Sequence, residues 1–454
     1  MKIDKIKTLA LMACVGGFLA SCSSDIDVSK VSEDPYQVND TTLAFITDKY
    51  GVSVLDSVTF SDKGSTDFYV NLSKAAADAA DFTVAYDEAA LTSYNAANGT
   101  HYKALPENLV TVNGAATVAA GNMKSKALSV DYASAASLDS LGVYAIPLVV
   151  KSNGNIKTSK KGEFVLLLRD ITKMPNCHKV GGTQVISCME VNNANPLHNL
   201  CYTLQKSGKL FFDQVILFSG NINYNAKTGE VYNYNNENVQ HLLDYKEKYL
   251  KPLQQKGMKV ILSIMGNHDR SGVSNFTKTG AKAFAKELKA VLSAYDLDGV
   301  FFDDEYSNYG NYPGFEAAPS SAAAARLCYE CKQAMPDKLI EVYAYSYTGS
   351  LPSVDGVQPG KFIDYAIQDY GAYGDMSGSY QGLAKSGMIQ ASSEFARGSI
   401  INYTTAKNIV TDGYGGTMIF SLDPKTGSVS RMNAIGQAFF GENVVQNGSY
   451  AKDW

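Results

Sequence analysis

The chain has 454 residues, more than one hydrophobic core ordinarily holds, so at least two domains are expected. Hydrophobic residues make up 45% of it and charged residues 19%, as in soluble globular proteins. A formal net charge of −5 leaves no basic surface of the kind that binds nucleic acid, so no nucleic-acid partner is expected.

The first 22 residues have the pattern of an export signal. Three lysines precede an apolar stretch over residues 8–20, which is too short to span a membrane as a mature helix. The stretch ends in LASC, which resembles the bacterial lipobox and implies cleavage before Cys22 and acylation of its thiol. We therefore expect a signal peptide over residues 1–21, a flexible tether over residues 22–40, and a lipid anchor through Cys22 at the outer membrane or cell surface. Ordinary secretion with an incidental cysteine is the alternative.

Residues 41–170 indicate a small all-β sandwich domain. Segments such as TDFYVNLS, DFTVAYD and YAIPLVVKS alternate apolar with polar residues and are separated by Gly, Asn, Asp and Ser, which is typical of antiparallel strands. One helical patch interrupts them, and its sequence YNAANGTHYKALPE resembles the N-terminal domain of unknown function 1735 of lipoproteins from glycan-foraging bacteria. That resemblance implies a spacer or a module close to carbohydrate.

Residues 171–454 have a different pattern of predicted elements, in which short apolar runs alternate with amphipathic helices. One of these helices, GAKAFAKELKAVLSAYD, places Phe284, Leu288 and Leu292 on a single face. Eight strand candidates fall in this span, and a (β/α)8 barrel needs roughly 250 residues. A doubly wound sheet has the same alternation of strands and helices, but no Gly-rich phosphate loop follows the first strand. The sequence therefore predicts an α/β fold in which a (β/α)8 TIM barrel over residues 171–454 follows the sandwich.

Five cysteines lie beyond the export signal, and an odd number cannot all pair within the chain. The pair Cys328 and Cys331 has the spacing of zinc ligands. Its flanks indicate a helix, however, and no second such pair exists to complete the four ligands of a structural zinc site. We therefore expect these two side chains to pack inside a helical layer.

The stretch LDGVFFDDEYSNYG, residues 297–310, delivers three carboxylates directly after a buried strand. Active groups of (β/α)8 barrels lie where strands end. Because side chains alternate along a strand, Phe301, Asp303 and Glu305 share one face, with the two carboxylates about 7 Å apart along the backbone. One such group can stay ionised while the other, less hydrated one keeps its proton. An acidic loop or a metal site is the alternative interpretation of this stretch.

Three strand ends together resemble glycoside hydrolase family 18, namely those of VILFSGNINYN, KVILSIMGNHD and DGVFFDDE. The segment from Asp298 to Glu305 is similar to the fourth-strand pattern DGxDxDxE, and KVILSIMGNHD is similar to the third-strand SxGG element. The Gly-Asn-His form of that element resembles the endo-β-N-acetylglucosaminidases of the H and F type. The resemblance covers about residues 180–430.

This resemblance implies a retaining, substrate-assisted hydrolysis of the β-1,4 bond in the N,N′-diacetylchitobiose core of N-linked glycans. Glu305 would protonate the glycosidic oxygen and later activate water, while the 2-acetamido oxygen of the substrate attacks the anomeric carbon. Asp303 would orient the acetamido N–H and stabilise the oxazolinium ion. No metal or organic cofactor is needed for this reaction, and none is expected.

The resemblance also implies a set of substrate-binding residues. Gln368 and Tyr370 match a Q-x-Y element whose amide and phenol hold the acetamido group. The alternatives are a strand-end hydrogen bond for Gln368 and one tyrosine among 29 for Tyr370. Asn267 would shape the wall of the substrate pocket, and its neighbour His268 is given no catalytic role.

One position departs from the family pattern, because Phe301 stands where the family has an aspartate. Loss of that like charge should lower the pKa of Asp303, whereas the apolar neighbour should raise it, and the sequence leaves the direction open. The departure gives weight to an alternative function, a non-catalytic glycan-binding lipoprotein on the same barrel. A chitinase is a third interpretation, disfavoured by the loop sequences and by the absence of internal tryptophan.

Overall fold

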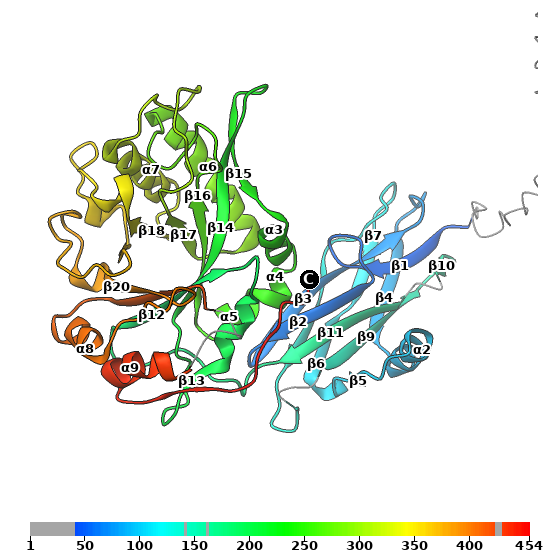
Figure 1. The fold of residues 1–454 in the computed structure, drawn as a ribbon. Helices are drawn as coiled ribbons and strands as arrows, with labels where there is room; N and C mark the ends of the chain where they lie inside the picture. The colour runs from blue at the N-terminus through cyan, green and yellow to red at the C-terminus, as the bar shows by residue number, and fades with distance from the viewer. Residues whose placement is uncertain (1–40, 140–142, 160–162, 423–428) are drawn as a thin grey trace, which may run out of the picture.

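The structure, a computed structural model, describes residues 41–139, 143–159, 163–422 and 429–454 (Figure 1). The expected signal peptide, lipobox cysteine and tether lie outside these ranges. Within them, no helix is both long and apolar enough to cross a membrane.

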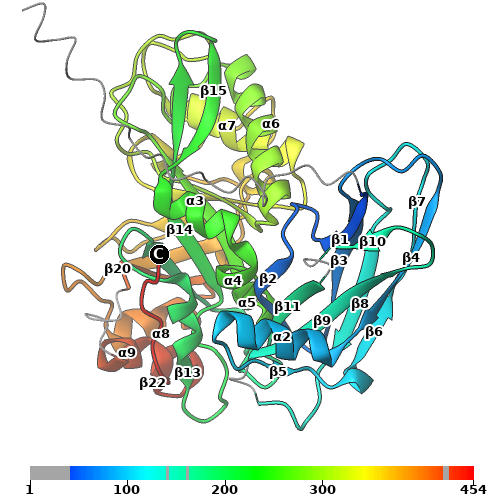
Figure 2. The ribbon, with the colours of Figure 1, turned by 90° about the vertical axis from the view of Figure 1, so that its right-hand side faces the viewer.

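Between residues 41 and 170 the described part of the chain is all-β apart from one α-helix and the short 3-10 turn η2 (Glu107–Leu109), as the sequence predicts (Figures 1 and 2). In its described part, one sheet has the spatial order β10 (Lys157–Thr158), β1 (Leu43–Thr47), β3 (Lys63–Leu72), β8 (Leu128–Ala133) and β6 (Val110–Asn113). The other has the order β2 (Val54–Phe60), β11 (Glu163–Asp170), β9 (Val143–Ser152), β4 (Ala80–Tyr86) and β7 (Ala115–Val118), with β5 (Lys103–Ala104) beside β9. Inward side chains of both sheets, among them Phe68, Val130, Ile146 and Phe164, form one buried cluster.

The single helix of this region, α2 (Glu88–Asn98), has well-defined ends. The side chain of Asp87 accepts a hydrogen bond from the backbone N–H of Ala89 at 3.0 Å, which caps the first turn. Gly99, with a φ of 65°, ends the helix in the left-handed conformation that glycine adopts most easily.

The remainder of the chain confirms the predicted (β/α)8 barrel. Eight parallel strands of the described residues close on themselves, since the first pairs with both the second and the last. In order they are β12 (Gln184–Glu190), β14 (Gln214–Asn225), β16 (Lys259–Met265), β17 (Gly299–Phe302), β18 (Leu339–Ala344), β19 (Tyr365–Gln368), β20 (Met388–Glu394) and β21 (Gly416–Phe420). A short antiparallel pair, β13 (Tyr202–Leu204) with β22 (Val444–Gln446), lies outside the barrel.

Helices cover the outside of the barrel unevenly. They are α3 (Glu237–Asp244), α4 (Lys246–Tyr249), α5 (Lys251–Gln255), α6 (Lys278–Tyr295), α7 (Ser321–Ala334), α8 (Tyr403–Thr411) and α9 (Val429–Phe440). The predicted apolar face of α6 is confirmed, with Phe284, Leu288 and Leu292 buried. Cys328 and Cys331 are buried on α7 as free thiols. Between β18 and β20 the described chain forms only short 3-10 turns in place of α-helices.

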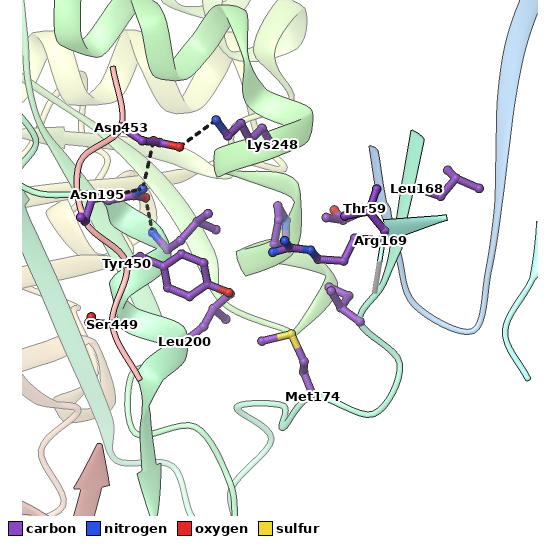
Figure 3. A pocket seen from close by; sticks show the side chains of 15 residues that line it. Thr59, Leu168, Arg169, Met174, Asn195, Leu200, Lys248, Ser449, Tyr450 and Asp453 are labelled. Atoms are coloured by element: carbon purple, nitrogen blue, oxygen red, sulfur yellow. Dashed lines mark hydrogen bonds and ion pairs between the residues drawn. The ribbon is translucent and has the colours of Figure 1, made fainter. Parts of the chain in front are cut away.

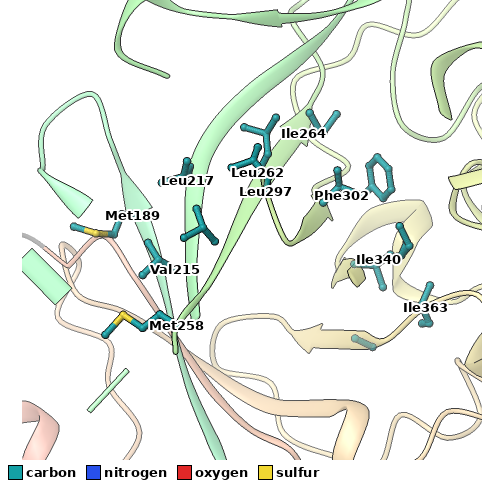
Figure 4. Packing of buried hydrophobic residues seen from close by; sticks show 14 of the residues in the cluster. Met189, Val215, Leu217, Met258, Leu262, Ile264, Leu297, Phe302, Ile340 and Ile363 are labelled. Carbon is teal, nitrogen blue, oxygen red and sulfur yellow. The ribbon is translucent and has the colours of Figure 1, made fainter. Parts of the chain in front are cut away.

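Two apolar layers hold the barrel together. Outward side chains of neighbouring strands, such as Leu217, Leu262 and Ile340, pack beneath the surrounding helices and loops (Figure 4). Inward side chains, such as Ile216, Ile261 and Phe301, form a separate cluster that fills the barrel. The strand ends are therefore fixed from both sides.

The β-sandwich packs against the flank of the barrel at α4 and α5 (Figures 1 and 2). The side chain of Gln255 donates to the carbonyl of Thr59 at 2.7 Å, and the hydroxyl of Thr59 donates to the carbonyl of Glu247 at 3.5 Å. A cavity of about 390 Å³ lies beside this contact, and the C-terminal segment closes it, with Asp453 paired to Lys248 at 2.8 Å (Figure 3). The cavity is on the side of the barrel, away from the strand ends.

Candidate active site

Asp303 and Glu305 follow β17 at the C-terminal rim of the barrel, on the face that Phe301 turns to the interior. Asp303 is only 4% exposed, and its Oδ1 has no hydrogen-bond partner among the residues that the structure describes. Burial raises the pKa of Asp303 well above its usual value, and the charges of Glu305, Asp304 and Asp369 raise it further. The pKa of Asp303 is therefore raised, because the effect of burial is larger than the effect of losing the neighbouring charge of the family aspartate. The sequence alone left the direction of this shift open.

Glu305 is the more accessible of the two carboxyl groups. Burial raises its pKa first, and the charge of Asp369 adds to that effect. Arg397 acts in the opposite direction and Asp304 in the same direction as Asp369. The result is a carboxyl group that keeps its proton to a higher pH than an exposed glutamate, as a general acid requires.

The backbone of Glu305 is fixed by the segment after β16. Its carbonyl oxygen accepts a hydrogen bond from the N–H of Gly266 at 3.0 Å. Gly266 lies so close that a Cβ there would be 2.7 Å from that oxygen and 2.1 Å from Ser307 Oγ. Only glycine allows the two loops to approach this closely, and the approach fixes how deep Glu305 lies in the mouth of the barrel.

The neighbouring loops contain several unusual backbone conformations. His268, Tyr306 and Tyr309 have positive φ values of 60°, 57° and 37°, a region that side-chain-bearing residues seldom occupy. Such conformations gather at functional sites, where the surrounding contacts hold them. One of those contacts is the hydrogen bond of 2.6 Å from the N–H of His268 to the carbonyl of Tyr306.

Asp304 turns to the opposite side of the strand end and braces two loops. Its carboxylate accepts hydrogen bonds from the hydroxyl of Tyr309 and from the backbone N–H of Tyr347, the latter at 3.0 Å. It is 5% exposed. Sequence reasoning did not assign it this positioning role, because Tyr347 belongs to a segment after β18 whose position the sequence does not disclose.

The Gln368-Asp369-Tyr370 element lies at the end of β19, in the same mouth. Ser392 Oγ donates to the carbonyl of Gln368 at 2.5 Å, and the N–H of Tyr370 donates to Asp369 Oδ1 at 2.6 Å. Burial raises the pKa of Tyr370, and the proximity of Cys188 and Asp303 raises it further. The structure therefore brings the Tyr370 phenol, which stays protonated, close to Asp303.

Asp369 and Tyr343 are site residues that sequence reasoning missed. The Tyr343 hydroxyl donates to the Asp369 carboxylate, and its ring lies 5.8 Å from that of Tyr370 and 6.2 Å from that of Phe301. Phe301 is thus part of an aromatic floor beneath the carboxylates. The available signal was the segment VYAYSY at the end of β18, where tyrosines alternate at a strand end.

Asn267 lies beside the mouth, but its side chain is already engaged. Its Nδ2 donates to Asn223 Oδ1 at 2.7 Å, which links the segment after β16 to the long strand β14. The ring of His268 packs against Tyr306 with centroids 5.2 Å apart. The role of Asn267 in binding substrate stays a prediction.

Across the described ranges, no three His, Cys, Asp or Glu side chains are grouped so that they could hold a metal ion. The groups present are a carboxyl group with a raised pKa, a buried carboxyl with a free oxygen, a phenol and an amide. These can donate a proton to a leaving oxygen, accept an N–H and stabilise a cation.

The chain is similar to two curated proteins over more than half of its length. It is 54% identical over 280 residues to endo-β-N-acetylglucosaminidase F1 of Elizabethkingia meningoseptica, which covers 60% of this chain and 82% of that protein. It is 37% identical over 244 residues to an endo-β-N-acetylglucosaminidase of a Flavobacterium species, which covers 53% of this chain and 76% of that protein.

Solved structures extend the similarity to the sandwich. EndoBT-3987 of Bacteroides thetaiotamicron, in the crystal with a Man5GlcNAc product, is 35% identical with a TM-score of 0.58. The match covers 90% of this chain and 97% of that one, and the same protein was crystallised with a Man9GlcNAc2Asn substrate. A family model described as an N-terminal domain matches residues 37–157.

Proposed function

The chain belongs to the endo-β-N-acetylglucosaminidases and is an N-glycan-cleaving glycoside hydrolase, and we propose that it works by a retaining, substrate-assisted mechanism at Asp303 and Glu305. The observation that supports this mechanism is a buried carboxylate oxygen without a partner, on Asp303, next to a carboxyl group with a raised pKa, on Glu305. An acetamido N–H would supply the missing partner.

In the first step Glu305 gives its proton to the glycosidic oxygen as the bond to the anomeric carbon breaks. The acetamido carbonyl oxygen of the same sugar attacks that carbon from the opposite face and forms an oxazolinium ion. Asp303 accepts the acetamido N–H. Its raised pKa opposes ionisation in the free protein, but the cation that forms beside it favours the ionised carboxylate. Opening of the ring by water, with Glu305 now as base, restores the β configuration.

Tyr370 and Gln368 are assigned to hold the acetamido group during these steps. The phenol keeps its proton because burial raises its pKa, so it can donate to the acetamido oxygen. The bond from Ser392 to the backbone of Gln368 fixes the end of β19 below them. Asn267 is assigned to the pocket wall, where its bond to Asn223 holds it.

The proposed bond is the β-1,4 linkage of the N,N′-diacetylchitobiose core. The test uses protein lacking residues 1–22, mixed with a high-mannose N-glycoprotein and followed by intact mass spectrometry, with Glu305→Gln as control. We expect the acceptor to shift to protein plus one GlcNAc with the wild type and to stay unchanged with the control. Glycan binding without any shift would instead support the non-catalytic lipoprotein.

We also propose that the mature protein is anchored at the outer membrane or cell surface through Cys22, with residues 22–40 as tether, 41–170 as sandwich and 171–454 as barrel. The LASC sequence and the resemblance to domain of unknown function 1735 support this arrangement. Fractionation of cells that produce the wild type or Cys22→Ala tests it. The wild type is expected in the membrane fraction and the variant in the soluble fraction; a soluble wild type would contradict the anchor.

A further inference from the structure

The cavity beside the contact between sandwich and barrel has a volume of about 390 Å³ and lies away from the active-site mouth. Its walls come from the sandwich strands β2 and β11, from η3 (Pro196–Cys201) and α5 of the barrel, and from the C-terminal segment (Figure 3). Pockets that hold small molecules have volumes of about 300–1,000 Å³ and are frequent at domain interfaces. The size and the place of this cavity therefore fit a ligand site.

The barrel side of the cavity is largely apolar. Leu197 and Leu200 of η3 and Pro252 of α5 line it. Ile171 and Met174, in the segment between β11 and β12, continue this apolar wall, and Figure 3 shows Leu200 and Met174 beside the same space. Water against such a wall finds few hydrogen-bond partners, so the wall favours the hydrocarbon part of a ligand.

On the sandwich side, one cation faces the cavity without a counter-charge. Arg169 is half-buried near the end of β11, and its side chain extends toward Tyr450 on the opposite wall (Figure 3). No carboxylate of the described ranges forms an ion pair with it. Burial raises the pKa of the Tyr450 phenol more than the neighbouring Arg169 lowers it, so this partner stays uncharged at neutral pH.

The other two charged groups that line the cavity neutralise each other. Lys248 and Asp453 form an ion pair at 2.8 Å. Asp453 also accepts hydrogen bonds from the Tyr249 hydroxyl at 2.8 Å and from Asn195 Nδ2 at 3.5 Å, so its carboxylate is fully engaged. The lining of the cavity therefore carries a single uncompensated positive charge, that of Arg169. A partly dehydrated cation is stabilised by an anion that reaches it.

These features define the chemistry of a matching ligand. A guanidinium binds a planar carboxylate through two parallel hydrogen bonds. A single positive charge matches a carboxylate better than a phosphate monoester, which carries a charge of about −1.5 to −2 at pH 7. The apolar wall across from the guanidinium requires that the rest of the ligand be a hydrocarbon chain and not a sugar or another polar group.

We propose that the cavity between sandwich and barrel is a binding site for a small amphipathic carboxylate. The carboxylate group lies at Arg169, and the hydrocarbon chain lies against Leu197 and Leu200. Such a ligand contacts the sandwich, the barrel and the C-terminal segment at once, so its binding stabilises the contact between the two domains. The site is separate from Asp303 and Glu305 and does not depend on the mechanism assigned to them.

The first test is titration calorimetry with octanoate, which joins one carboxylate to a hydrocarbon chain, on protein lacking residues 1–22. The control 1-octanol keeps the chain without the charge, and acetate keeps the charge without the chain. We expect one saturable site for octanoate and at least about tenfold weaker binding of both controls, equivalent to ~1.4 kcal/mol. Saturating octanoate should also raise the melting temperature. Absence of saturable octanoate binding, or equally tight binding of 1-octanol, would overturn the proposal.

The second test removes the charge with Arg169→Gln, which should raise the Kd of octanoate about tenfold or more. Lys151→Gln is the matched control, because Lys151 is an exposed cation on β9 of the same sheet and does not line the cavity. This control should bind octanoate like the wild type. Hydrolysis of Man9GlcNAc2Asn by the wild type should stay within twofold at saturating octanoate. An unchanged Kd in Arg169→Gln, or competition between octanoate and the glycan, would contradict the site.

A third test locates the ligand directly and needs no variant, so it decides the question even if Arg169→Gln does not fold. Crystals of the wild type grown with 8-bromooctanoate are expected to show the anomalous signal of bromine beside Leu197 and Leu200, with the carboxylate at Arg169. A bromine signal elsewhere, or an empty cavity at a concentration that saturates binding in solution, would refute the assignment.

Discussion

Replacing Gly266 by alanine tests whether the loop after β16 sets the position of Glu305, the proposed general acid. The φ of Gly266 is not in the left-handed region, so the substitution changes the space and not the allowed backbone. The new Cβ would lie 2.7 Å from the carbonyl oxygen of Glu305, about 0.7 Å short of the 3.4 Å at which ordinary contact begins. Since that oxygen is backbone, the whole of residue 305 must move by a similar amount.

A displacement of 1 Å at a catalytic group costs about 100-fold in rate, so we expect kcat to fall about 10- to 100-fold in Gly266→Ala. Crowding of this kind also lowers the free energy of unfolding by about 1–3 kcal/mol. The assay is the initial rate of Man9GlcNAc2Asn hydrolysis at saturation, with thermal unfolding measured alongside. Gly154→Ala is the matched control, because a Cβ there meets nothing within 4 Å. Unchanged kcat in Gly266→Ala, with or without a lower melting temperature, would refute the positional argument.

Three further substitutions probe the charges around the site and the barrel. Asp369→Asn removes a charge that raises the pKa of Glu305, so the alkaline limb of the kcat/KM profile should move to lower pH; an unmoved limb would contradict this assignment. Asp304→Ala breaks the two bonds that brace the loops and should lower the free energy of unfolding by about 1–3 kcal/mol, measured by urea denaturation, whereas a wild-type midpoint would show that the brace is dispensable. Glu341, buried against Gln214, has a pKa raised by burial from 4.5 to about 8, so its folded form loses stability as the pH rises from about 4.5 to 8. Glu341→Gln should remove this loss of folding stability, which amounts to about 4 kcal/mol by pH 8. If the melting temperatures of the wild type and the variant changed with pH in the same way, this assignment would be wrong.

The barrel and its two carboxylates could be predicted because their signals are local. Apolar runs alternate with amphipathic helices at barrel spacing, and the alternation along β17 alone places Asp303 and Glu305 on one face. The resemblance to family 18 added Gln368 and Tyr370, and the structure places them at the end of β19. The placement of the two carboxylates, by contrast, needs only their position relative to β17.

The rest of the site depends on contacts between distant segments. The segment NINYNAKTGEVYNYNNEN is largely a β-hairpin, and its many polar residues conceal the alternation from which a strand is predicted. Tyr343 acquires its role only because β18 and β19 are neighbours in the barrel. Asn267, predicted to line the pocket, has its amide taken up by Asn223 of the hairpin. These contacts join segments that are far apart in the sequence, so they follow from the closure of the barrel and cannot be predicted from any single segment.

The most direct test of the mechanism is the configuration of the sugar at the moment of release. Rapid proton NMR of Man9GlcNAc2Asn hydrolysis would follow the anomeric signals of the freed reducing-end GlcNAc before mutarotation. Attack by the acetamido oxygen followed by water inverts the anomeric carbon twice, so the β-anomer should appear first and the α-anomer only later. Initial release of the α-anomer would mean that water attacks the anomeric carbon directly, and the roles assigned to Asp303 and Glu305 would then be wrong.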